Sequence, residues 1–492
     1  MINGMDDMIQ FFHSDKLNPL REFMLSKQYM LFLLVVTCIF SALEWNVMGV
    51  LLLAVIIGVT LIVSKDIMPT FLPFMLLCLI SAKCYNSFSI FIQYTYLGIL
   101  LIGCLLFHFI VYRKPMDWRG ELLLPMAVVS VVVLLGGVGF ISAKEYFSPL
   151  SLFYMAALGF GMTFLYVLLK THMTVKREYS LLYALTAVMV ISGCFACFTL
   201  LMQYIIHLSK VLTTHEMLFM QYRNNYSTFL MLSIPFAFFL GHKKPYGIML
   251  GFFFYFCILL TGSRGGLVFG AIEIMMCCIL FILYDKKRRL TYICICLCLL
   301  FAVLIVMKDF PSAFTSTFDR LLQAINGVLN GEQQEVRYFQ YQRGIQDFLK
   351  NPIFGTGIGY MGNRDVYQAA DFAIGWYHCS VIQIPASFGV FGILAYLYLF
   401  VKRLIVLWKK PTMFNMTVFL SYISLELMSL VNPGIFSPVP YLLIATIFFA
   451  VVENCNGNEK QHKIHLRKSV KKGKSRKIFK TKKAEAVSEN VQ

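Results

Sequence analysis

Charged side chains are scarce in this sequence, at 14% of 492 residues, against about 25% in ordinary soluble domains. Hydrophobic residues make up 59% of the chain, above the roughly 45–50% that soluble proteins carry. This balance excludes a soluble globular protein, because too few polar groups remain to cover its surface. The sequence therefore predicts an all-α membrane protein that crosses the bilayer many times.

A cleavable signal sequence is also missing. Residues 1–28 are polar and of mixed charge, and the first apolar run, from Tyr29, leads to Trp45 rather than to a small-residue cleavage site. We therefore expect the first span to remain in the protein as an anchor.

The sequence lacks recognisable metal and cofactor motifs. Cys194 and Cys197 have the spacing of a redox pair, but they lie in an apolar run without a histidine nearby, where thiols act as small hydrophobes. No second histidine lies at metal-ligand spacing from His378, which argues against zinc. Residues 354–360 have G-x-G-x-G spacing and follow no evident strand, so we expect a loop with exposed backbone N–H groups rather than a dinucleotide site. The sequence thus predicts neither a metal nor a cofactor.

Positive charge, by contrast, is in excess, with 43 Lys and Arg against 25 Asp and Glu. Residues 460–483 hold twelve Lys or Arg and no acid. We interpret residues 454–492 as a disordered cytoplasmic tail that lies against anionic lipid headgroups, rather than as a nucleic-acid-binding segment. Residues 1–453 form the predicted membrane domain.

Apolar runs of about the length that crosses a bilayer recur along the whole membrane domain. They predict about 12–14 transmembrane helices, with candidates at 29–43, 46–63, 68–82, 89–111, 121–142, 149–169, 180–206, 227–240, 246–262, 265–284, 290–307, 379–401, 413–431 and 437–453. We find no internal repeat and no interrupted span among them.

Basic residues gather in every second connection, which assigns these connections and both termini to the cytoplasm. They are Arg113, Lys114 and Arg119; Lys170, Lys176 and Arg177; Lys243 and Lys244; residues 286–289; and Lys402, Arg403, Lys409 and Lys410. The outer face then receives residues 207–226, the junction at Arg264, the turn at Asn432-Pro433 and a long loop at 308–378. In that loop we expect an amphipathic helix around 318–329 and a second helix from Glu335 to Lys350, ended by Asn351-Pro352.

Four residues on the predicted outer face point to an anionic substrate: Arg223, Arg264, Arg337 and His378. An arginine at the bilayer centre costs roughly 2.5–3.5 kcal/mol to insert, so Arg264 between Gly262, Gly265 and Gly266 is expected to have an anionic partner. We expect these glycines to leave space around it. Arginine presents a fixed fork of donors that matches phosphate oxygens, and a histidine moves protons near neutral pH.

Two acids lie within predicted spans. Glu273 is nine residues past Arg264 and faces away from it on an ideal helix, so we interpret it as structural. Glu426 lies near the outer end of its span, where it could pair with an arginine or accept a proton, and is a further candidate.

The order of these motifs resembles the O-antigen ligase and polymerase superfamily. Thr261-Gly-Ser-Arg-Gly-Gly266 opens a span, an outer loop helix ends in Asn351-Pro-Ile-Phe-Gly-Thr-Gly357, and His378 precedes Phe388-Gly-Val-Phe-Gly392. The resemblance covers about residues 200–400 with its motifs. It implies a metal-independent glycosyltransferase of the bacterial cytoplasmic membrane with an outward-facing site.

By this resemblance, the protein takes a glycan from an undecaprenyl-diphosphate carrier and joins it, with inversion, to an acceptor hydroxyl. Arg264 matches the family's diphosphate-binding arginine, Arg223 a second arginine, and Arg337 the loop-helix arginine. His378 would accept the acceptor's proton or hold the phosphates. The family commonly has His-Asn where this chain has His378-Cys379, so no role of that asparagine carries over.

The acceptor stays open among another lipid-linked repeat unit, a lipid anchor, a wall glycan and a protein. We favour a polymerase of a surface or capsular polysaccharide, because no separate acceptor-recognition domain is visible. A transporter or flippase of lipid-linked glycans is the alternative, although transporters often contain inverted repeats and broken helices.

Overall fold

The computed structural model describes residues 2–81, 95–136, 149–173, 181–206, 223–242, 244–286, 288–309, 336–358, 377–432, 434–436 and 438–456. These residues form helices and turns, with no β-strand among them. The all-α, polytopic prediction is therefore confirmed. The amphipathic helix expected at 318–329 and most of the basic tail lie outside the described residues.

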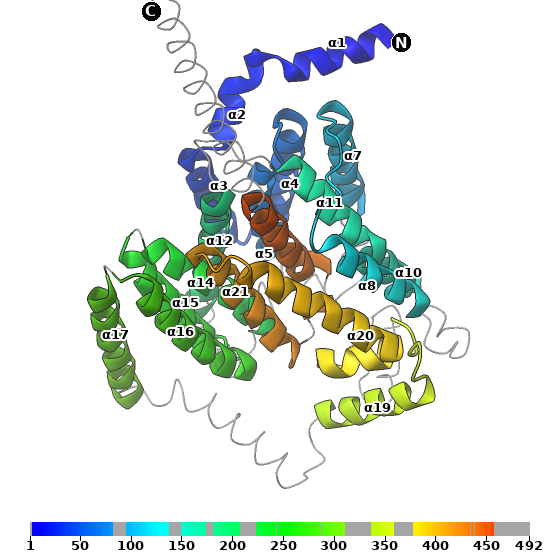
Figure 1. Ribbon diagram of the computed structural model, residues 1–492. Helices are drawn as coiled ribbons and strands as arrows, with labels where there is room; N and C mark the ends of the chain where they lie inside the picture. The colour runs from blue at the N-terminus through cyan, green and yellow to red at the C-terminus, as the bar shows by residue number, and fades with distance from the viewer. Residues whose placement is uncertain are drawn as a thin grey trace, which may run out of the picture.

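The first half of the chain forms the upper part of the molecule in Figure 1, and α1 projects from it. Its helices are α1 (Ile2–His13), α2 (Asn18–Met24), α3 (Lys27–Ala42), α4 (Asn46–Val63), α5 (Phe71–Ile80), α7 (Thr95–Val111), α8 (Leu123–Gly136), α10 (Pro149–Ala156), α11 (Met162–His172) and α12 (Leu181–Ile206). Short 3-10 turns lie at Asp15–Leu17 and Met68–Thr70.

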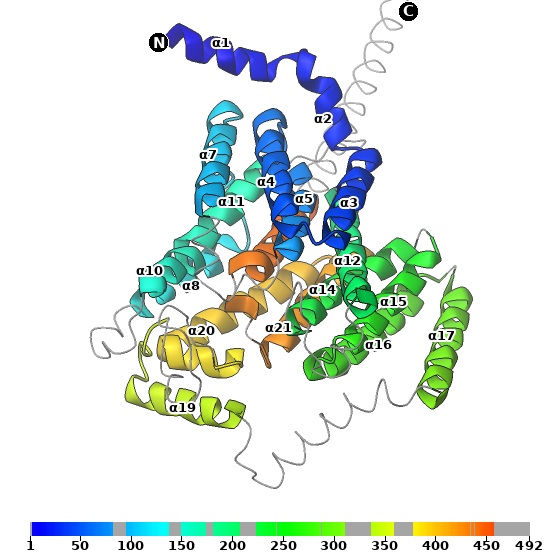
Figure 2. The ribbon, with the colours of Figure 1, turned by 180° about the vertical axis from the view of Figure 1, so that it is seen from behind.

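Most of the second half of the chain forms the lower part, with α17 along one edge and α19 beneath α20, whereas its last helix, orange to red, lies higher, beside α5 (Figures 1 and 2). Its helices are α14 (Arg223–Gly241), α15 (Tyr246–Leu260), α16 (Arg264–Tyr284), α17 (Arg289–Asp309), α19 (Val336–Lys350), α20 (Ser380–Trp408), α21 (Met413–Ser429) and a last helix at Pro440–Asn456. A 3-10 turn at Gly434–Phe436 and a π-helical turn at Pro438–Leu442 precede or open the last helix.

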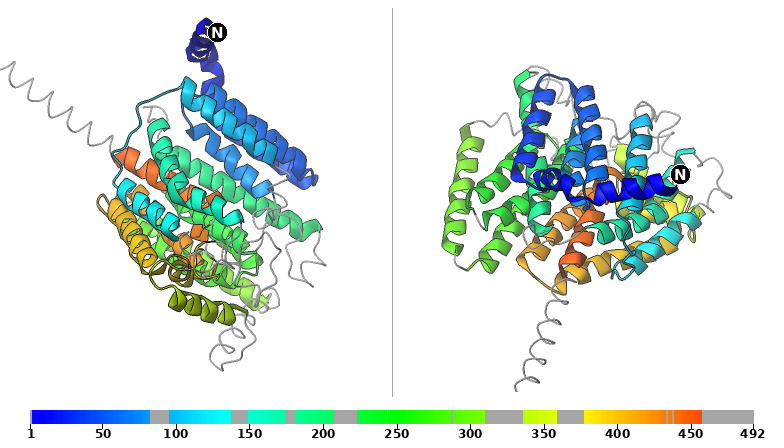
Figure 3. Two further views of the ribbon diagram at one scale, coloured as in Figure 1. Left: turned by 90° about the vertical axis from the view of Figure 1, so that its right-hand side faces the viewer. Right: turned by 90° about the horizontal axis from the view of Figure 1, so that it is seen from above.

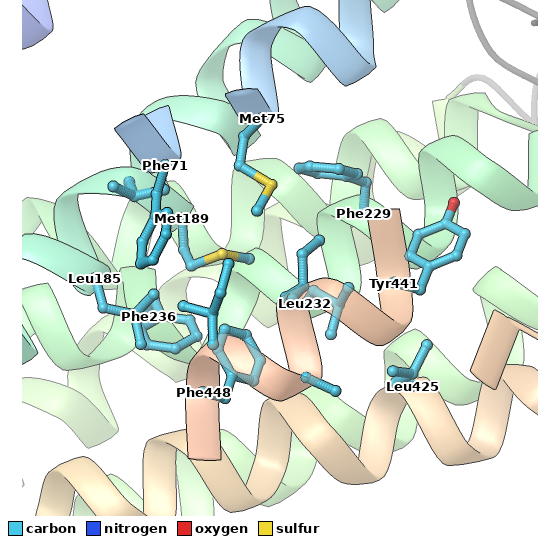
Figure 4. Close-up of a cluster of buried hydrophobic side chains, with 14 of the residues drawn as sticks. Phe71, Met75, Leu185, Met189, Phe229, Leu232, Phe236, Leu425, Tyr441 and Phe448 are labelled. Atoms are coloured by element: carbon cyan, nitrogen blue, oxygen red, sulfur yellow. The ribbon is translucent and has the colours of Figure 1, made fainter. Parts of the chain in front are cut away.

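Helix α14 occupies the centre and packs against α12, α15, α16 and α21. Its residues from Asn225 to Phe239 are buried throughout, including Ser227, Thr228 and Ser233. Figure 4 shows its Phe236 beside Phe448 of the last helix, and its Phe229 beside Met75 of α5. A helix that is apolar on every side and lies inside a bundle is expected for a central span.

Each of the fourteen candidate spans overlaps a helix of the structure. Among the described residues, five helices have the length and composition to cross a membrane alone, or six if the bent pair 15–24 and 27–42 counts as one span. Six shorter apolar helices accompany them in the same part of the chain. The views in Figure 3 show the helices as a layered bundle. The number of spans in a bilayer stays a prediction.

The expectation of uninterrupted spans is wrong. The predicted span 379–401 is broken at Gly389, where φ is 63° and ψ is −156°, and the span 149–169 is broken at Gly159. The helix pair 15–24 and 27–42 is bent by 58°. Hydropathy did not reveal these breaks, because a glycine within an apolar run leaves the average almost unchanged.

Side-chain contacts show which predicted connections lie at the same end of the bundle. Lys170 forms ion pairs with Asp117 at 3.4 Å and with Glu453 at 3.3 Å. Lys409 reaches Glu121 at 2.8 Å, and the Lys410 ammonium donates to the carbonyl oxygen of Asn456 at 3.0 Å. Residues assigned to the cytoplasm thus meet one another and the end of the last helix, and we call this the basic end.

The other end, which we call the site end, is where α14 and α16 begin and α21 finishes. The Ser263 hydroxyl donates to Oδ1 of Asn224 at 2.8 Å, and the Ser227 and Thr261 hydroxyls lie 2.9 Å apart. Gly265 at the start of α16 lies against Met428 and Val431 at the end of α21. Residues from three predicted outer segments therefore come together at this end.

Candidate functional site

Arg223 and Arg264 are brought to neighbouring helix starts. Each is the first residue of its helix, in α14 and α16 respectively, and both side chains are half-buried. The hydrogen bond between Ser263 and Asn224 joins the residue before Arg264 to the residue after Arg223. Helix starts attract anions through their free N–H groups, so two helix starts and two guanidinium groups make this region strongly attractive to an anion.

Ser263 fixes the start of α16. Its extended backbone, with φ −79° and ψ 116°, precedes the helix, and its hydroxyl accepts a hydrogen bond from the Gly266 N–H at 3.1 Å. Such a cap satisfies one of the helix's unpaired donors. Because the same hydroxyl donates to Asn224, the cap also sets the position of Arg264 relative to α14.

The glycines around Arg264 have a different role from the one expected. A Cβ on Gly266 would lie 2.6 Å from the Ser227 hydroxyl oxygen, and one on Gly265 would lie 2.8 Å from Val431. These two glycines therefore allow α14 and α21 to approach α16 closely and do not leave space for a ligand. Gly262, with φ 65°, provides the left-handed turn before the cap.

Arg223 also lies near α12. It interacts electrostatically with Tyr204, whose hydroxyl donates to the carbonyl oxygen of Leu260 at the end of α15. The arginine pair is therefore surrounded by the ends of α12, α14, α15 and α16.

His378 lies at the start of α20 in an unusual backbone conformation. Its φ is 53°, in the left-handed region that few non-glycine residues adopt. Tyr377 beside it is fully buried, and its backbone N–H donates to Oε1 of Gln383 at 3.0 Å. Strained backbone of this kind persists only where the surroundings hold it, and it is enriched at functional sites.

Helix α19 provides much of that support. The Tyr377 hydroxyl donates to Oδ2 of Asp347, and the other carboxylate oxygen lies 3.5 Å from Nε of Arg343. The expected loop helix at 335–350 is present as α19. Arg337 belongs to it, but its side chain lies outside the described part of the structure, so its place at the site stays a prediction.

The described part of the glycine-rich segment after α19, which ends at residue 358, is docked on α20. Its N–H groups at residues 355–357 are paired rather than exposed as expected. The Thr356 and Gly357 N–H groups donate to the carbonyl oxygens of Ala386 and Ser387, at 2.8 and 3.0 Å. In return, the Val390 N–H donates to the carbonyl oxygen of Pro352 at 2.8 Å. The backbone forms these bonds because it approaches α20 at Gly389, where a Cβ would lie 2.3 Å from an Ile353 oxygen.

Glu426 does pair with an arginine through a bridging hydroxyl, and that arginine is Arg403. The Tyr422 hydroxyl donates to Oε1 of Glu426, and Nη1 of Arg403 lies 3.4 Å from the same hydroxyl. The Arg403 guanidinium also lies over the rings of Tyr422 and Phe449, 5.2 and 5.3 Å from their centroids. We placed Arg403 in a cytoplasmic connection, but α20 continues to Trp408 and buries its side chain to 5% exposure.

A cavity of about 410 Å³ contains this polar group. Its walls come from α8, α11, α20, α21 and the start of the last helix, and they include Ser380, two residues after His378. Among the described residues that line it, Arg403 and Glu426 are the charged ones, and most of the others are apolar. The cavity therefore links the surroundings of His378 to Glu426.

Arg264 does not line this cavity. Gly265 beside it contacts the face of α21 that carries Met428, whereas Glu426, two residues earlier, lies about 200° away around the helix. The candidate residues therefore form two groups. Arg223 and Arg264 lie together, Glu426 lies near the segment of His378, and α21 separates the two groups.

Tyr422 was not among the site residues predicted from the sequence. Its position four residues before Glu426 places both side chains on the same face of α21.

Glu273 lies away from both groups. It is 2% exposed in α16, which packs against α21, and its carboxyl group faces Ser424. Within the described ranges, no group of three or more His, Cys, Asp or Glu side chains could hold a metal ion. The cysteines there are free thiols.

Comparison with known families gives one match, to a family described as O-antigen ligase, over residues 248–397. The matched segment runs from α15 to the middle of α20 and includes Arg264, Arg337 and His378. No curated protein and no solved structure matches the chain. The match supports glycan ligase or polymerase chemistry in general and, as its partner, a lipid-linked oligosaccharide. The match over residues 248–397 thus supports the O-antigen ligase and polymerase superfamily for this multi-span protein.

Proposed function

We propose that the protein transfers a glycan from an undecaprenyl-diphosphate carrier to an acceptor hydroxyl at the outer face of the bacterial cytoplasmic membrane. The observation that carries the proposal is the pairing of Arg223 and Arg264 at two adjoining helix starts, joined through Asn224 and Ser263. The proposed orientation, with the site end outside and both termini inside, rests on the basic residues that meet at the opposite end.

In this reaction the acceptor oxygen attacks the anomeric carbon, and the bond from that carbon to the diphosphate oxygen breaks. Negative charge grows on the leaving diphosphate, so guanidinium groups already in place lower the barrier. Arg223 and Arg264 would bind the diphosphate, and Arg337 would join them from α19. Because attack comes from the face opposite the leaving group, the anomeric configuration is inverted, and the arginines replace a metal ion.

The acceptor's proton must leave as its oxygen forms the new bond. His378, held by the α19 contacts of its neighbour Tyr377, could accept that proton or bind a phosphate oxygen, and both roles remain part of the proposal. Glu426 is the second candidate for the proton. Its carboxylate is fixed by Tyr422 and opens onto the cavity that begins near Ser380.

We favour a polymerase of a surface or capsular polysaccharide over a ligase. The test is the size of the lipid-linked glycan in cells that lack this protein, compared on a gel with the complemented strain and with an Arg264→Ala strain. Single repeat units on the carrier would identify a polymerase, and full-length chains on the carrier would identify a ligase. The Arg264→Ala strain should match the deletion strain while its protein still inserts in the membrane.

A transporter or flippase of lipid-linked glycans is the second candidate, and the breaks at Gly389 and Gly159 favour keeping it, because broken helices are common in transporters. The same gel separates the two functions once outer-face glycans are labelled selectively. Without a flippase, the lipid-linked units would be missing from the outer face; without the proposed enzyme, they would accumulate there.

A further inference from the structure

The cavity at α20 and α21 is open to the side of the bundle. Three of its lining residues, Val381, Ile393 and Leu397, are 60%, 40% and 55% exposed. In a membrane protein, apolar side chains exposed on a span face the hydrocarbon of the bilayer. A molecule that enters the cavity this way therefore comes from the lipid phase.

The cavity reaches inward from the site end. Leu430 and Ile435 line it near the end of α21, and Tyr422 lines it eight residues before Leu430, which is about 12 Å further along the helix. Its volume of about 410 Å³ is within the roughly 300–1,000 Å³ range of small-ligand sites. The shape and the apolar walls suit a hydrocarbon chain that enters beside Ser380.

The polar side chains at the inner part of the cavity, Arg403, Tyr422 and Glu426, are unfavourable for binding an anionic headgroup. Arg403 is accompanied by Glu426 through Tyr422, so the two charges offset each other. Burial of an arginine in the bilayer is costly, and the stacked rings of Tyr422 and Phe449 and the nearby carboxylate offset that cost. In the proposed function, the diphosphate binds instead beside Arg223 and Arg264, at the starts of α14 and α16.

We propose that this cavity holds the apolar chain of a lipid-linked acceptor. The inference rests on the proposed function and names its acceptor class. The donor's diphosphate would bind at Arg223 and Arg264 on one face of α21, and the acceptor's chain would lie in the cavity on another face. The acceptor's head would then emerge beside Ser380, close to His378, where its hydroxyl must lose a proton. In this arrangement the chain lies beside Glu426, so His378 would be the residue that accepts the proton. An acceptor without a lipid chain, such as a wall glycan or a protein, would not use the cavity.

The experiment places a larger side chain at the side of the cavity that faces the lipid. Leu397→Trp adds a large ring to a lining residue, and Leu394→Trp adds the same ring one turn away on α20, at a residue that is 58% exposed and does not line the cavity. With the full protein in nanodiscs and a synthetic isoprenoid-diphosphate glycan as acceptor, Leu397→Trp should raise the acceptor KM about tenfold with little change in kcat. Leu394→Trp should behave like the unmodified protein.

A binding readout separates this inference from the proposed function. The probe is the same diphosphate glycan with a diazirine in its isoprenoid chain, photolysed in nanodiscs and mapped by peptide mass spectrometry. We expect crosslinks to peptides of α20 and α21 around Leu397 and Ile423, lost in Leu397→Trp and retained in Leu394→Trp and Arg264→Ala. Crosslinks that are absent from these peptides, or equal in both tryptophan variants, would overturn the cavity assignment. Loss of transfer in Leu397→Trp for an acceptor without a lipid chain would also overturn it.

Discussion

At the scale of single residues, the site is set by hydroxyl and amide groups as much as by arginines. Ser263 accepts from Gly266 and donates to Asn224, so one hydroxyl both starts α16 and connects it to α14. Arg264 follows directly, so the hydrogen bonds of Ser263 determine where the Arg264 side chain starts. The sequence contains both residues in recognisable motifs, but the hydrogen bond between segments 39 residues apart is visible only in the fold.

We predict that Ser263→Ala lowers kcat/KM for glycan transfer and that Ser263→Thr largely retains it. Loss of an N-cap costs about 0.5–2 kcal/mol. If that cost destabilises the transition state of glycan transfer, kcat/KM decreases by roughly two- to thirtyfold. Threonine keeps the hydroxyl and can serve the same two partners. Steady-state kinetics of the three proteins in nanodiscs checks this, and equal activity of the alanine variant would argue against a positioning role.

At the scale of elements, α19, the segment 352–357 and the start of α20 form one unit. Backbone hydrogen bonds join this segment to residues 386–390, and Gly355 and Gly389 both have positive φ, 72° and 63°. The existence of α19 and α20 follows from the sequence pattern, because a long apolar or amphipathic run is sufficient to predict a helix. The break at Gly389 does not follow from the pattern, since Gly389 is in contact with Pro352 and Ile353, which lie 37 and 36 positions earlier in the chain.

We predict that Gly389→Ala disrupts this unit and abolishes transfer. A Cβ there would lie 2.3 Å from a backbone oxygen of Ile353, and the positive φ adds strain of about 1–3 kcal/mol. The matched control is Gly98→Ala in α7, where nothing lies within 4 Å of the added Cβ. Limited proteolysis between α19 and α20 should speed up in Gly389→Ala alone; unchanged proteolysis together with full activity would contradict the assignment.

At the scale of the whole molecule, the last helix is held to the basic end by buried charges. Glu453 accepts from the N–H groups of Glu121 and Leu122, each at 3.2 Å, and pairs with Lys170. Both side chains of the Lys170–Glu453 pair are 6% exposed. Three of the connections that the distribution of basic charge assigns to the cytoplasm meet at this end. Which side of the membrane this end faces stays a prediction. The pairing of particular charges was not predictable from sequence.

We predict that Lys170→Met destabilises the protein by about 3–5 kcal/mol, because it leaves the Glu453 carboxylate buried without its cation. The double variant Lys170→Met/Glu453→Gln should regain part of that loss. Lys409→Met is the control, since its ion pair with Glu121 is exposed at 53% and 44% and such pairs contribute about 0–1 kcal/mol. Unfolding in detergent measures all three, and equal losses for Lys170→Met and Lys409→Met would refute the importance of the buried pair.

The sequence predicts which residue types could form the candidate site, but not how those residues are arranged in space. Arg223, Arg264 and His378 were identified because charged groups are rare and expensive in an apolar chain, whereas Arg403 was assigned to a connection because it adjoins Lys402. The cavity could not be foreseen at all, since its walls come from helices more than 200 residues apart in the chain.

The central claim is that Arg264 binds the diphosphate of a lipid-linked glycan during its transfer, and one reconstitution tests it most directly. Purified protein and its Arg264→Ala variant are incubated in nanodiscs with a synthetic isoprenoid-diphosphate oligosaccharide, and the products are separated by mass. We predict lengthened glycan and free isoprenoid diphosphate from the unmodified protein, and neither product from a variant that is folded and inserted. Equal product from both proteins would contradict the account.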